Sequence, residues 1–290
     1  MVKATIEKLL KDGISMIEKR EYNNPFLDVQ LILSFLLKKD KIYLHINKDQ
    51  EVDQEITNKF YEMVNKRNSG YPLQYMTNEQ EFMGLNFFVQ EGVLIPRPDT
   101  ETLVEKIISI VNENEYFKHN NINILDLGTG SGAIGLSLAH YIKNSFVTCV
   151  DISDIAIETA KKNMKNFNIK NVEIIKGDIF GELNLKDQKY HIVVSNPPYI
   201  EKEIIKNLQT EVSTYEPKLA LDGGEDGLDF YRQIVLLYEQ LHADKSVLSV
   251  EIGHDQSQKV EEIFKSINLF ARIETDKDLG DNHRVVTGFL

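Results

Sequence analysis

The stretch DLGTGSGAIG, residues 126–135, decides the fold of this 290-residue chain. It follows the apolar run INIL at 122–125 and leads into the amphipathic stretch GAIGLSLAHYIK, which predicts a strand, a turn and a helix. Gly128, Gly130 and Gly132 permit a tight turn and let a ligand approach the main chain. In doubly wound sheets, ligands bind at the carboxyl ends of such strands. The stretch therefore predicts a ligand site at the end of a parallel strand.

Downstream of this turn the sequence alternates between apolar runs and helical patterns. The predicted strands are SFVTCVDI (145–152), VEIIKGD (172–178), YHIVVSN (190–196) and SVLSVEIG (246–253). Helices are expected in SDIAIETAKKNMKNF (153–167), GLDFYRQIVLLYEQL (227–241) and DQSQKVEEIFKSI (255–267). This alternation predicts an α/β fold with a parallel sheet covered on both faces. The runs FARIETD (270–276) and RVVTGFL (284–290) predict an antiparallel pair at the end of the sheet.

Upstream of the turn the pattern is different. The first seventy residues predict helices only, and one of them has a matched start signal in Asn24, a candidate N-cap, followed by Pro25. EFMGLNFFVQEGVLIP, at 81–96, predicts a β-hairpin. We therefore predict a helical domain at 1–76, a hairpin linker at 77–96 and an α/β domain at 97–290.

Composition narrows the class of protein. The net charge of −12 argues weakly against a nucleic-acid partner, since phosphate binding needs a basic surface. The longest apolar run, LILSFLL at 31–37, is too short to cross a bilayer, and the single cysteine, Cys149, suits a reducing cytoplasm. The seven histidines show no metal-ligand spacing, so no metal site is expected.

Three acidic residues at predicted strand ends indicate a nucleoside-containing cofactor. Asp151 lies 25 residues after Asp126, at about the spacing where a carboxylate binds the hydroxyl groups of a ribose. Asp178 is placed to accept a hydrogen bond from the amino group of an adenine. Gly130, Gly132 and Gly135 also fit the dinucleotide fingerprint, a weak signal alone. Asp126, next to the glycines, better suits the cationic end of S-adenosylmethionine. The glycines could instead be plain turn residues and the acids helix caps.

The motif NPPY, at 196–199, ends another predicted strand beside the same cleft. An amide nitrogen is a poor nucleophile because its lone pair is delocalised. The side-chain carbonyl of Asn196 and the backbone carbonyl of Pro197 can each accept one N–H of a planar NH₂ group and hold its nitrogen towards a methyl donor. Pro198 stiffens the turn, and Tyr199 could stack on a planar substrate. These residues predict methyl transfer to an amide or amino nitrogen.

The chain also resembles a known family, the glutamine methyltransferases of peptide chain release factors, called HemK or PrmC. The resemblance extends over most of the sequence. It rests on PLQYM, EFMGLNFFV, VLIPRPDTETLVE, ILDLGTGSGAIGLSLA, SNPPYI, YEPKLALDGGEDGLDFYRQI, EIGHDQ and RVVTGFL, in that order.

This resemblance implies a seven-stranded, Rossmann-like class I methyltransferase domain behind a small helical domain that helps to clasp the substrate protein. The donor would be S-adenosylmethionine, and the acceptor would be the glutamine of the Gly-Gly-Gln loop in class 1 release factors, giving a role in translation termination. The resemblance implies that the cofactor contacts are Gly128, Thr129, Gly130, Ser131, Gly132, Asp151, Asp178, Ile179 and Asn196. It implies that the glutamine is held by Asn196, Pro197, Pro198 and Tyr199. Ile179 stands where the family often has an aromatic residue beside adenine.

Two other functions remain open on the sequence. An adenine-N6 methyltransferase of DNA or RNA also has to methylate a nitrogen whose lone pair is delocalised. It would, however, need a positively charged surface to bind the nucleic-acid backbone. A nucleotide-binding module without catalysis would require NPPY to be a strand terminator only. Replacement of Asn196 discriminates between these functions, because catalysis should collapse while cofactor binding survives.

Overall fold

The structure is a computed structural model that describes residues 4–20, 22–181, 183, 185 and 188–290. These residues form two compact units. The helical unit contains the chain up to Asn78 together with Leu208–Tyr215. The sheet unit contains Glu79–Asn207 and Glu216–Leu290.

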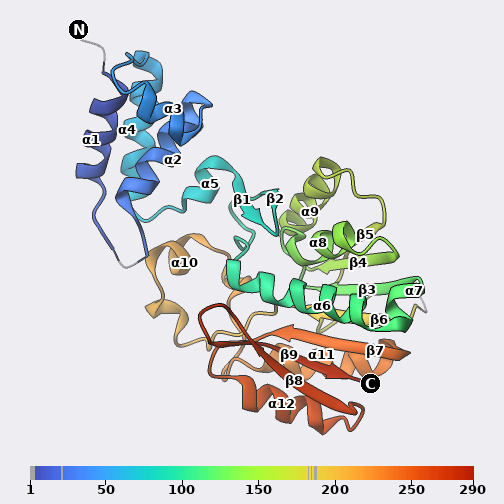
Figure 1. Cartoon of the computed structure of the whole chain (residues 1–290). Helices are drawn as coiled ribbons and strands as arrows, with labels where there is room; N and C mark the ends of the chain where they lie inside the picture. Colours follow the sequence, from blue (N-terminus) through green and yellow to red (C-terminus); the bar gives the residue numbers. More distant parts are fainter. Residues whose placement is uncertain (1–3, 21, 182, 184, 186–187) are drawn as a thin grey trace. The chain divides into compact units, whose positions relative to one another are not determined.

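The helical unit is built from short helices around its own apolar core. Its elements are α1 (Ile6–Met16), α2 (Pro25–Leu37), α3 (Lys41–Ile46), α4 (Gln54–Asn68), α5 (Leu73–Thr77) and α10 (Thr210–Tyr215), labelled in Figure 1. Asn24 caps α2 as expected, since its side chain accepts a hydrogen bond from the Leu27 amide at 3.3 Å. Pro25 is the first residue of the helix. Ile32, Leu33 and Phe60 are fully buried between these helices.

A buried ion-pair network fixes α10 within the helical unit. Arg67 of α4 is 4% exposed, and its guanidinium contacts Asp28 of α2 at 2.6 Å and Glu211 of α10 at 2.5 Å. Tyr71 packs edge-to-face on Tyr215 with 5.1 Å between the ring centroids. Residues 208–215 fall within the domain predicted at 97–290, because a contact between segments so far apart in the chain leaves no local pattern in the sequence.

The sheet unit contains a seven-stranded mixed sheet in the order β5-β4-β3-β6-β7-β9-β8. Its strands are β3 (Ile122–Leu127), β4 (Ser145–Asp151), β5 (Val172–Lys176), β6 (Tyr190–Ser195), β7 (His242–Glu251), β8 (Arg272–Lys277) and β9 (His283–Phe289). The strands β3 to β7 run parallel, and β9 pairs antiparallel with both β7 and β8. The predicted α/β class and the antiparallel pair at the C-terminus are confirmed.

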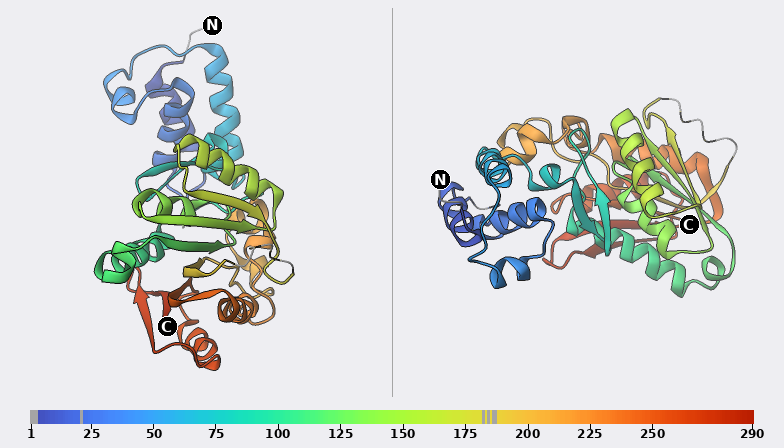
Figure 2. Two further views of the ribbon diagram at one scale, coloured as in Figure 1. Left: turned by 90° about the vertical axis from the view of Figure 1, so that its right-hand side faces the viewer. Right: turned by 90° about the horizontal axis from the view of Figure 1, so that it is seen from above.

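Helices cover both faces of this sheet, as Figures 1 and 2 show. The helices α6 (Glu101–Glu113), α8 (Ala133–Tyr141) and α9 (Asp154–Asn166) contribute to one apolar cluster, which also includes α7 (Glu115–His119). The second cluster contains α11 (Asp229–Leu241) and α12 (Ser257–Ser266). The hairpin of β1 (Glu79–Phe82) and β2 (Leu85–Phe88) belongs to the first cluster through Phe82 and Phe87. Three single turns, η1 (Pro98–Thr100), η2 (Ile205–Asn207) and η3 (Lys218–Ala220), complete the unit.

The order of the strands reverses at β3. Its neighbours are β4 on one side and β6 on the other, so the loops that follow these strands open side by side. This topological switch point is where open α/β sheets bind ligands. None of the helices in the described part of the chain is long and apolar enough to cross a membrane.

Candidate active site

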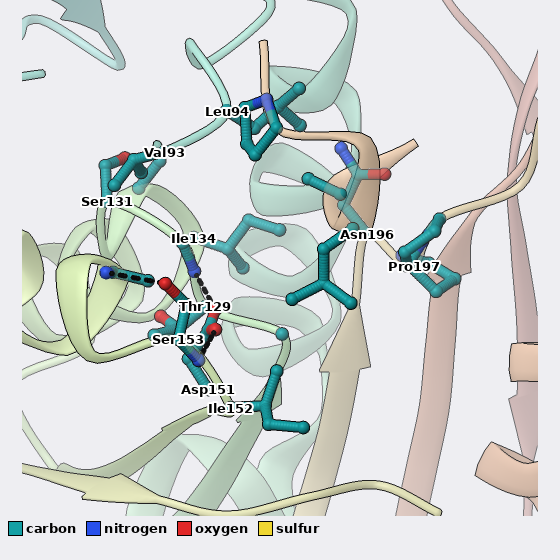
Figure 3. Close-up of a pocket in the computed structure, with 18 of the residues that line it drawn as sticks. Val93, Leu94, Thr129, Ser131, Ile134, Asp151, Ile152, Ser153, Asn196 and Pro197 are labelled. Atoms are coloured by element: carbon teal, nitrogen blue, oxygen red, sulfur yellow. Dashed lines mark hydrogen bonds between the residues drawn. The ribbon is translucent and has the colours of Figure 1, made fainter. Parts of the chain in front are cut away.

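A pocket of about 350 Å³ lies at the switch point. Its walls come from the segments after β3, β4, β5 and β6, from residues 92–100 and 217–220, and from Phe230 of α11. The residues predicted from the sequence that line it are Gly128, Thr129, Gly130, Ser131, Asp151, Asp178, Ile179, Asn196, Pro197 and Pro198. Figure 3 shows labelled side chains around this space, with Asp151 on one side and Asn196 and Pro197 on the other.

The glycine turn exposes main chain to the pocket. Gly128 and Gly130 have φ of +75° and +57°, in the region where side chains are strained, and no described atom lies within 4 Å of a Cβ added at Gly128. The backbone can therefore approach a ligand closely at this point. Gly132 (φ +84°) is the N-cap of α8 and does not line the pocket. A Cβ there would meet Leu136 at 2.7 Å, so Gly132 serves close packing, and its predicted cofactor contact is not supported.

Asp126 supports the turn from within the protein. It is fully buried and absent from the pocket wall, and its Oδ2 accepts from the Thr129 hydroxyl at 2.5 Å and from the Gly135 amide at 2.9 Å. Burial raises the pKa of its carboxyl group to about 7. This burial does not support the expectation that Asp126 meets the cationic end of the cofactor, and the contacts of Oδ2 make the residue a support of the glycine turn.

Asp151 and Asp178 do line the pocket. Asp151 accepts from the Gly130 amide through Oδ2 at 2.8 Å and from the Ser153 amide through Oδ1 at 2.9 Å. Burial raises its pKa, while these two backbone donors oppose the rise. Each oxygen keeps a further lone pair, which suits the hydroxyls of a ribose. Asp178 accepts from the Phe180 amide at 2.9 Å, and Phe180 also lines the pocket beside Ile179.

Asn196 and Pro197 follow the carboxyl end of β6. The Nδ2 atom of Asn196 donates to the Thr100 hydroxyl at 3.1 Å. Within the described residues, no donor is hydrogen-bonded to Oδ1 of Asn196 or to the carbonyl of Pro197. We call these two oxygens the acceptor pair. Both belong to residues that line the pocket.

Tyr199 has a different place from the one predicted. It does not line the pocket, and its hydroxyl lies 3.5 Å from Oε1 of the buried Glu251. Its backbone carbonyl accepts from Gln256 at 2.9 Å. Burial raises the pKa of the phenol. This geometry does not support stacking of Tyr199 on a substrate and makes the residue a support of the turn after β6.

Sequence reasoning missed the part of the wall that comes from 92–100 and 217–220. Val93, Leu94 and Leu219 supply apolar surface there, and Arg97 pairs with the buried Glu216 at 2.6 Å. The only signal was membership of two tracts, VLIPRPDTETLVE and YEPKLAL, quoted for the resemblance without roles of their own. Nothing in their local pattern shows that they meet in space.

Gly223 packs directly on the backbone of the NPPY turn. A Cβ at this position would lie 2.8 Å from Cα of Tyr199 and 2.9 Å from the carbonyl oxygen of Pro198. Main-chain atoms cannot move aside as a side chain does, so we expect Gly223→Ala to shift the turn. Since a shift of about 1 Å costs on the order of 10² in rate, kcat should fall about 10²-fold.

Steady-state kinetics and thermal unfolding of Gly223→Ala check this expectation. Gly84→Ala is the control, because Gly84 has φ +70° in the β1–β2 turn, outside the pocket wall. It should lose about 1 kcal/mol of stability yet keep its activity. Normal kcat in Gly223→Ala would show that the turn tolerates displacement.

The pocket fits S-adenosylmethionine. Its volume lies in the range of small-molecule sites, its glycine turn is open to a ligand, and Asp151 presents a carboxylate suited to ribose hydroxyls. Ile152, Ile179 and Phe180 offer apolar surface for a flat base. The fold and the pocket define a Rossmann-like methyltransferase that uses S-adenosylmethionine.

Comparison with known proteins identifies the family. Residues 118–267 match the methyltransferase domain family, and residues 8–77 match the PrmC N-terminal domain family. The release factor glutamine methyltransferase of Clostridium acetobutylicum is 42% identical over 270 residues, which cover 92% of this chain and 93% of that protein. The enzyme of the same name from Fusobacterium nucleatum is 42% identical over 96% of this chain and 77% of its own length. The chain belongs to the release factor glutamine methyltransferase family.

Solved structures agree on the fold. The catalytic domain of hMettl16, in complex with the MAT2A 3′UTR hairpin 6, aligns with a TM-score of 0.54 over 78% of this chain and 81% of that chain. The sequence identity is only 16%, so this likeness concerns the methyltransferase fold alone.

Proposed function

We propose that this enzyme methylates the side-chain amide nitrogen of the glutamine in the Gly-Gly-Gln motif of class 1 peptide chain release factors. It acts in the cytoplasm, in translation termination, without a direct nucleic-acid partner. The names of the similar proteins support the substrate class, and the geometry at the end of β6 supports the chemistry.

The acceptor pair is the observation that carries this proposal. A glutamine side chain ends in a flat NH₂ with two N–H donors, and two adjacent residues of the pocket wall carry carbonyl oxygens that accept no hydrogen bond from the described residues. Because Nδ2 of Asn196 is engaged by Thr100, the amide of Asn196 is left as an acceptor towards a ligand. Two hydrogen bonds to one NH₂ restrain its nitrogen and favour pyramidal geometry, in which the lone pair is available for attack.

Other residues bind and orient the cofactor. When bound, S-adenosylmethionine supplies an electrophilic methyl group on a positively charged sulfur. Gly128 and Gly130 would let the main chain approach it, Asp151 would hold the ribose hydroxyls, and Ile179 with Phe180 would flank the adenine. Positioning of this kind can lower a barrier by roughly 7–11 kcal/mol, and no strong general base is needed before attack, since the amide loses its proton after the transfer.

The alternative, an adenine-N6 methyltransferase, uses the same chemistry on another substrate. It would need a basic surface for a phosphate backbone, whereas this chain has a net charge of −12. The net negative charge of the chain therefore favours a protein substrate over a nucleic acid.

Methylation in vitro tests the proposal. The enzyme is incubated with S-adenosylmethionine labelled in the methyl group and with a bacterial class 1 release factor, and separately with duplex DNA. We expect label in the release factor, located by mass spectrometry on the glutamine of the Gly-Gly-Gln peptide. A factor with that glutamine replaced by alanine should remain unlabelled. Label in DNA, or label elsewhere in the factor, would contradict the proposal.

A further inference from the structure

We propose that Thr100 and Glu251 are positioning residues that set the orientation of the Asn196 side-chain amide, with Nδ2 turned inward and Oδ1 left for the substrate. This inference rests on the proposed function, because it explains how one half of the acceptor pair is kept as an acceptor. Neither residue is needed to touch the glutamine or the reacting methyl group.

The three side chains come from different parts of the sheet unit. Asn196 follows β6, Thr100 ends η1 before α6, and Glu251 ends β7 beside β6. Nδ2 of Asn196 lies 3.1 Å from Oγ1 of Thr100. The Thr100 side chain also lies close enough to the Glu251 carboxyl group to lower its pKa, and Oε2 of Glu251 is buried without a hydrogen-bond partner among the described residues. Thr100 is thus next to both the amide at the pocket and a buried acid with an unpartnered oxygen.

The direction of each hydrogen bond follows from the number of donors. An ionised carboxylate can only accept, and a hydroxyl has a single proton. With Glu251 ionised, Thr100 gives its proton to the carboxylate and can offer only lone pairs to Asn196. The amide of Asn196 must then turn its NH₂ towards Thr100, which leaves Oδ1 on the other side. An amide free to flip would spend part of its time presenting an NH₂ to the substrate NH₂, a repulsive contact.

Glu251 is held in an unusual environment for an acid. It is 1% exposed, and burial raises the pKa of its carboxyl group to about 7. The charged and titratable groups that face it are Arg284 and the Tyr199 hydroxyl, which favour its charge, Asp99, which disfavours it, and Tyr231, whose hydroxyl donates to the backbone carbonyl of Glu251. A buried carboxylate is costly, so its retention beside Thr100 is better explained by a role in the site than by stability.

The Thr100 hydroxyl is not used to cap the helix that begins beside it. It occupies the N-cap position of α6, yet its side chain makes no capping hydrogen bond there. Its hydroxyl accepts a hydrogen bond from Asn196, which leaves the hydroxyl proton for the unpartnered oxygen of Glu251. Valine has nearly the same shape as threonine, so Thr100→Val removes this hydroxyl with little change in packing, while Thr100→Ser keeps it.

Kinetics of the two Thr100 variants with the release factor give the first test. We expect Thr100→Val to lower kcat roughly 10- to 100-fold, the range expected for a mispositioned reacting group. The KM for the release factor and the Kd for S-adenosylmethionine, measured by calorimetry, should each change less than about threefold. Thr100→Ser should recover most of kcat. Equal activity of valine and serine variants would overturn the proposal.

NMR of the protein without cofactor or substrate gives a readout that does not depend on catalysis. In ¹⁵N-labelled enzyme, the side-chain NH₂ pair of Asn196 is assigned by its loss in Asn196→Ala. We expect its protons to exchange slowly with water in the wild type and in Thr100→Ser, and at least about tenfold faster in Thr100→Val. Unchanged exchange in Thr100→Val would contradict the inferred hydrogen bond.

The pH dependence of Glu251→Gln tests the role of the acid. The positioning form is the carboxylate, and since its pKa is raised to about 7, this form appears only as the pH rises through that value. Glutamine does not titrate. The ratio of wild-type kcat to that of Glu251→Gln should therefore fall about tenfold from pH 8 to pH 6. The buried Asp126 also titrates near pH 7, but it is present in both proteins and cancels in the ratio.

The two kinds of readout separate this inference from the proposed function. If the wild type fails to methylate any release factor while the Asn196 exchange responds to Thr100→Val, the substrate assignment fails and the positioning contact stands. If methylation occurs as proposed but exchange and the pH ratio do not respond to either residue, the positioning inference fails alone.

Discussion

Asn196→Ala is expected to lower kcat for release factor methylation about 10³-fold, the scale seen when a preorganised polar group is removed from a reacting centre. The change deletes Oδ1 of the acceptor pair and leaves only the Pro197 carbonyl to hold the glutamine NH₂. The Kd for S-adenosylmethionine should rise less than about fivefold, because the glycine turn and Asp151 are untouched. Single-turnover kinetics and calorimetry measure the two quantities.

Asn196→Asp and Asn196→Gln sharpen this test. The aspartate keeps an acceptor oxygen but has no NH₂ to donate to Thr100, and the glutamine keeps both groups on a longer stem. Both variants should stay at least about 10²-fold below the wild type, since a displacement of about 1 Å is already costly. Wild-type kcat in Asn196→Ala would show that the side-chain carbonyl does not hold the substrate.

Asp151→Ala is expected to weaken S-adenosylmethionine binding about 10²-fold, that is, by about 3 kcal/mol, through the loss of charge-assisted hydrogen bonds. The loss has two sources, the oxygens offered to ribose and the hydrogen bond that fixes the Gly130 amide at 2.8 Å. Calorimetric titration of the variant measures the effect directly.

Asp154→Ala is the matched control for this variant. Asp154 is a carboxylate three residues further on, it is mostly exposed, and its ion pair is with Lys176 outside the pocket wall. Its removal should leave the Kd within about twofold, because exposed ion pairs contribute little. Equal Kd values for the two variants would remove Asp151 from the cofactor site.

The fold could be predicted from local signals because those signals are strong. The buried strand 122–127, the glycine turn and the helix α8 form one continuous pattern in the sequence, and the alternation after it continues to β9. The contact of residues 208–215 with the helical unit could not be predicted in this way. It includes the ion pair of Arg67 with Glu211, two residues that are 144 positions apart in the sequence.

The site was predicted unevenly for a related reason. Residues directly after strand ends, such as Asp151 and Asn196, line the pocket because the sheet carries all such ends to one edge. Whether a side chain then turns into the pocket or into the core is not encoded in spacing. Asp126 and Tyr199 do not line the pocket, because Asp126 binds the Thr129 hydroxyl and the Gly135 amide within the protein, and the Tyr199 hydroxyl faces the buried Glu251. Thr100 and Glu251 had no local signal, since each acquires its role only through contacts across the sheet unit.

A crystal structure of the enzyme with S-adenosylhomocysteine and a peptide containing Gly-Gly-Gln tests the role of the acceptor pair most directly. The distances from the glutamine Nε2 to Oδ1 of Asn196 and to the carbonyl oxygen of Pro197 are measured. We expect both to lie at about 2.7–3.2 Å, the range of a hydrogen bond. A glutamine amide bound beside the sulfur with its NH₂ turned away from these two oxygens would contradict the proposed mechanism.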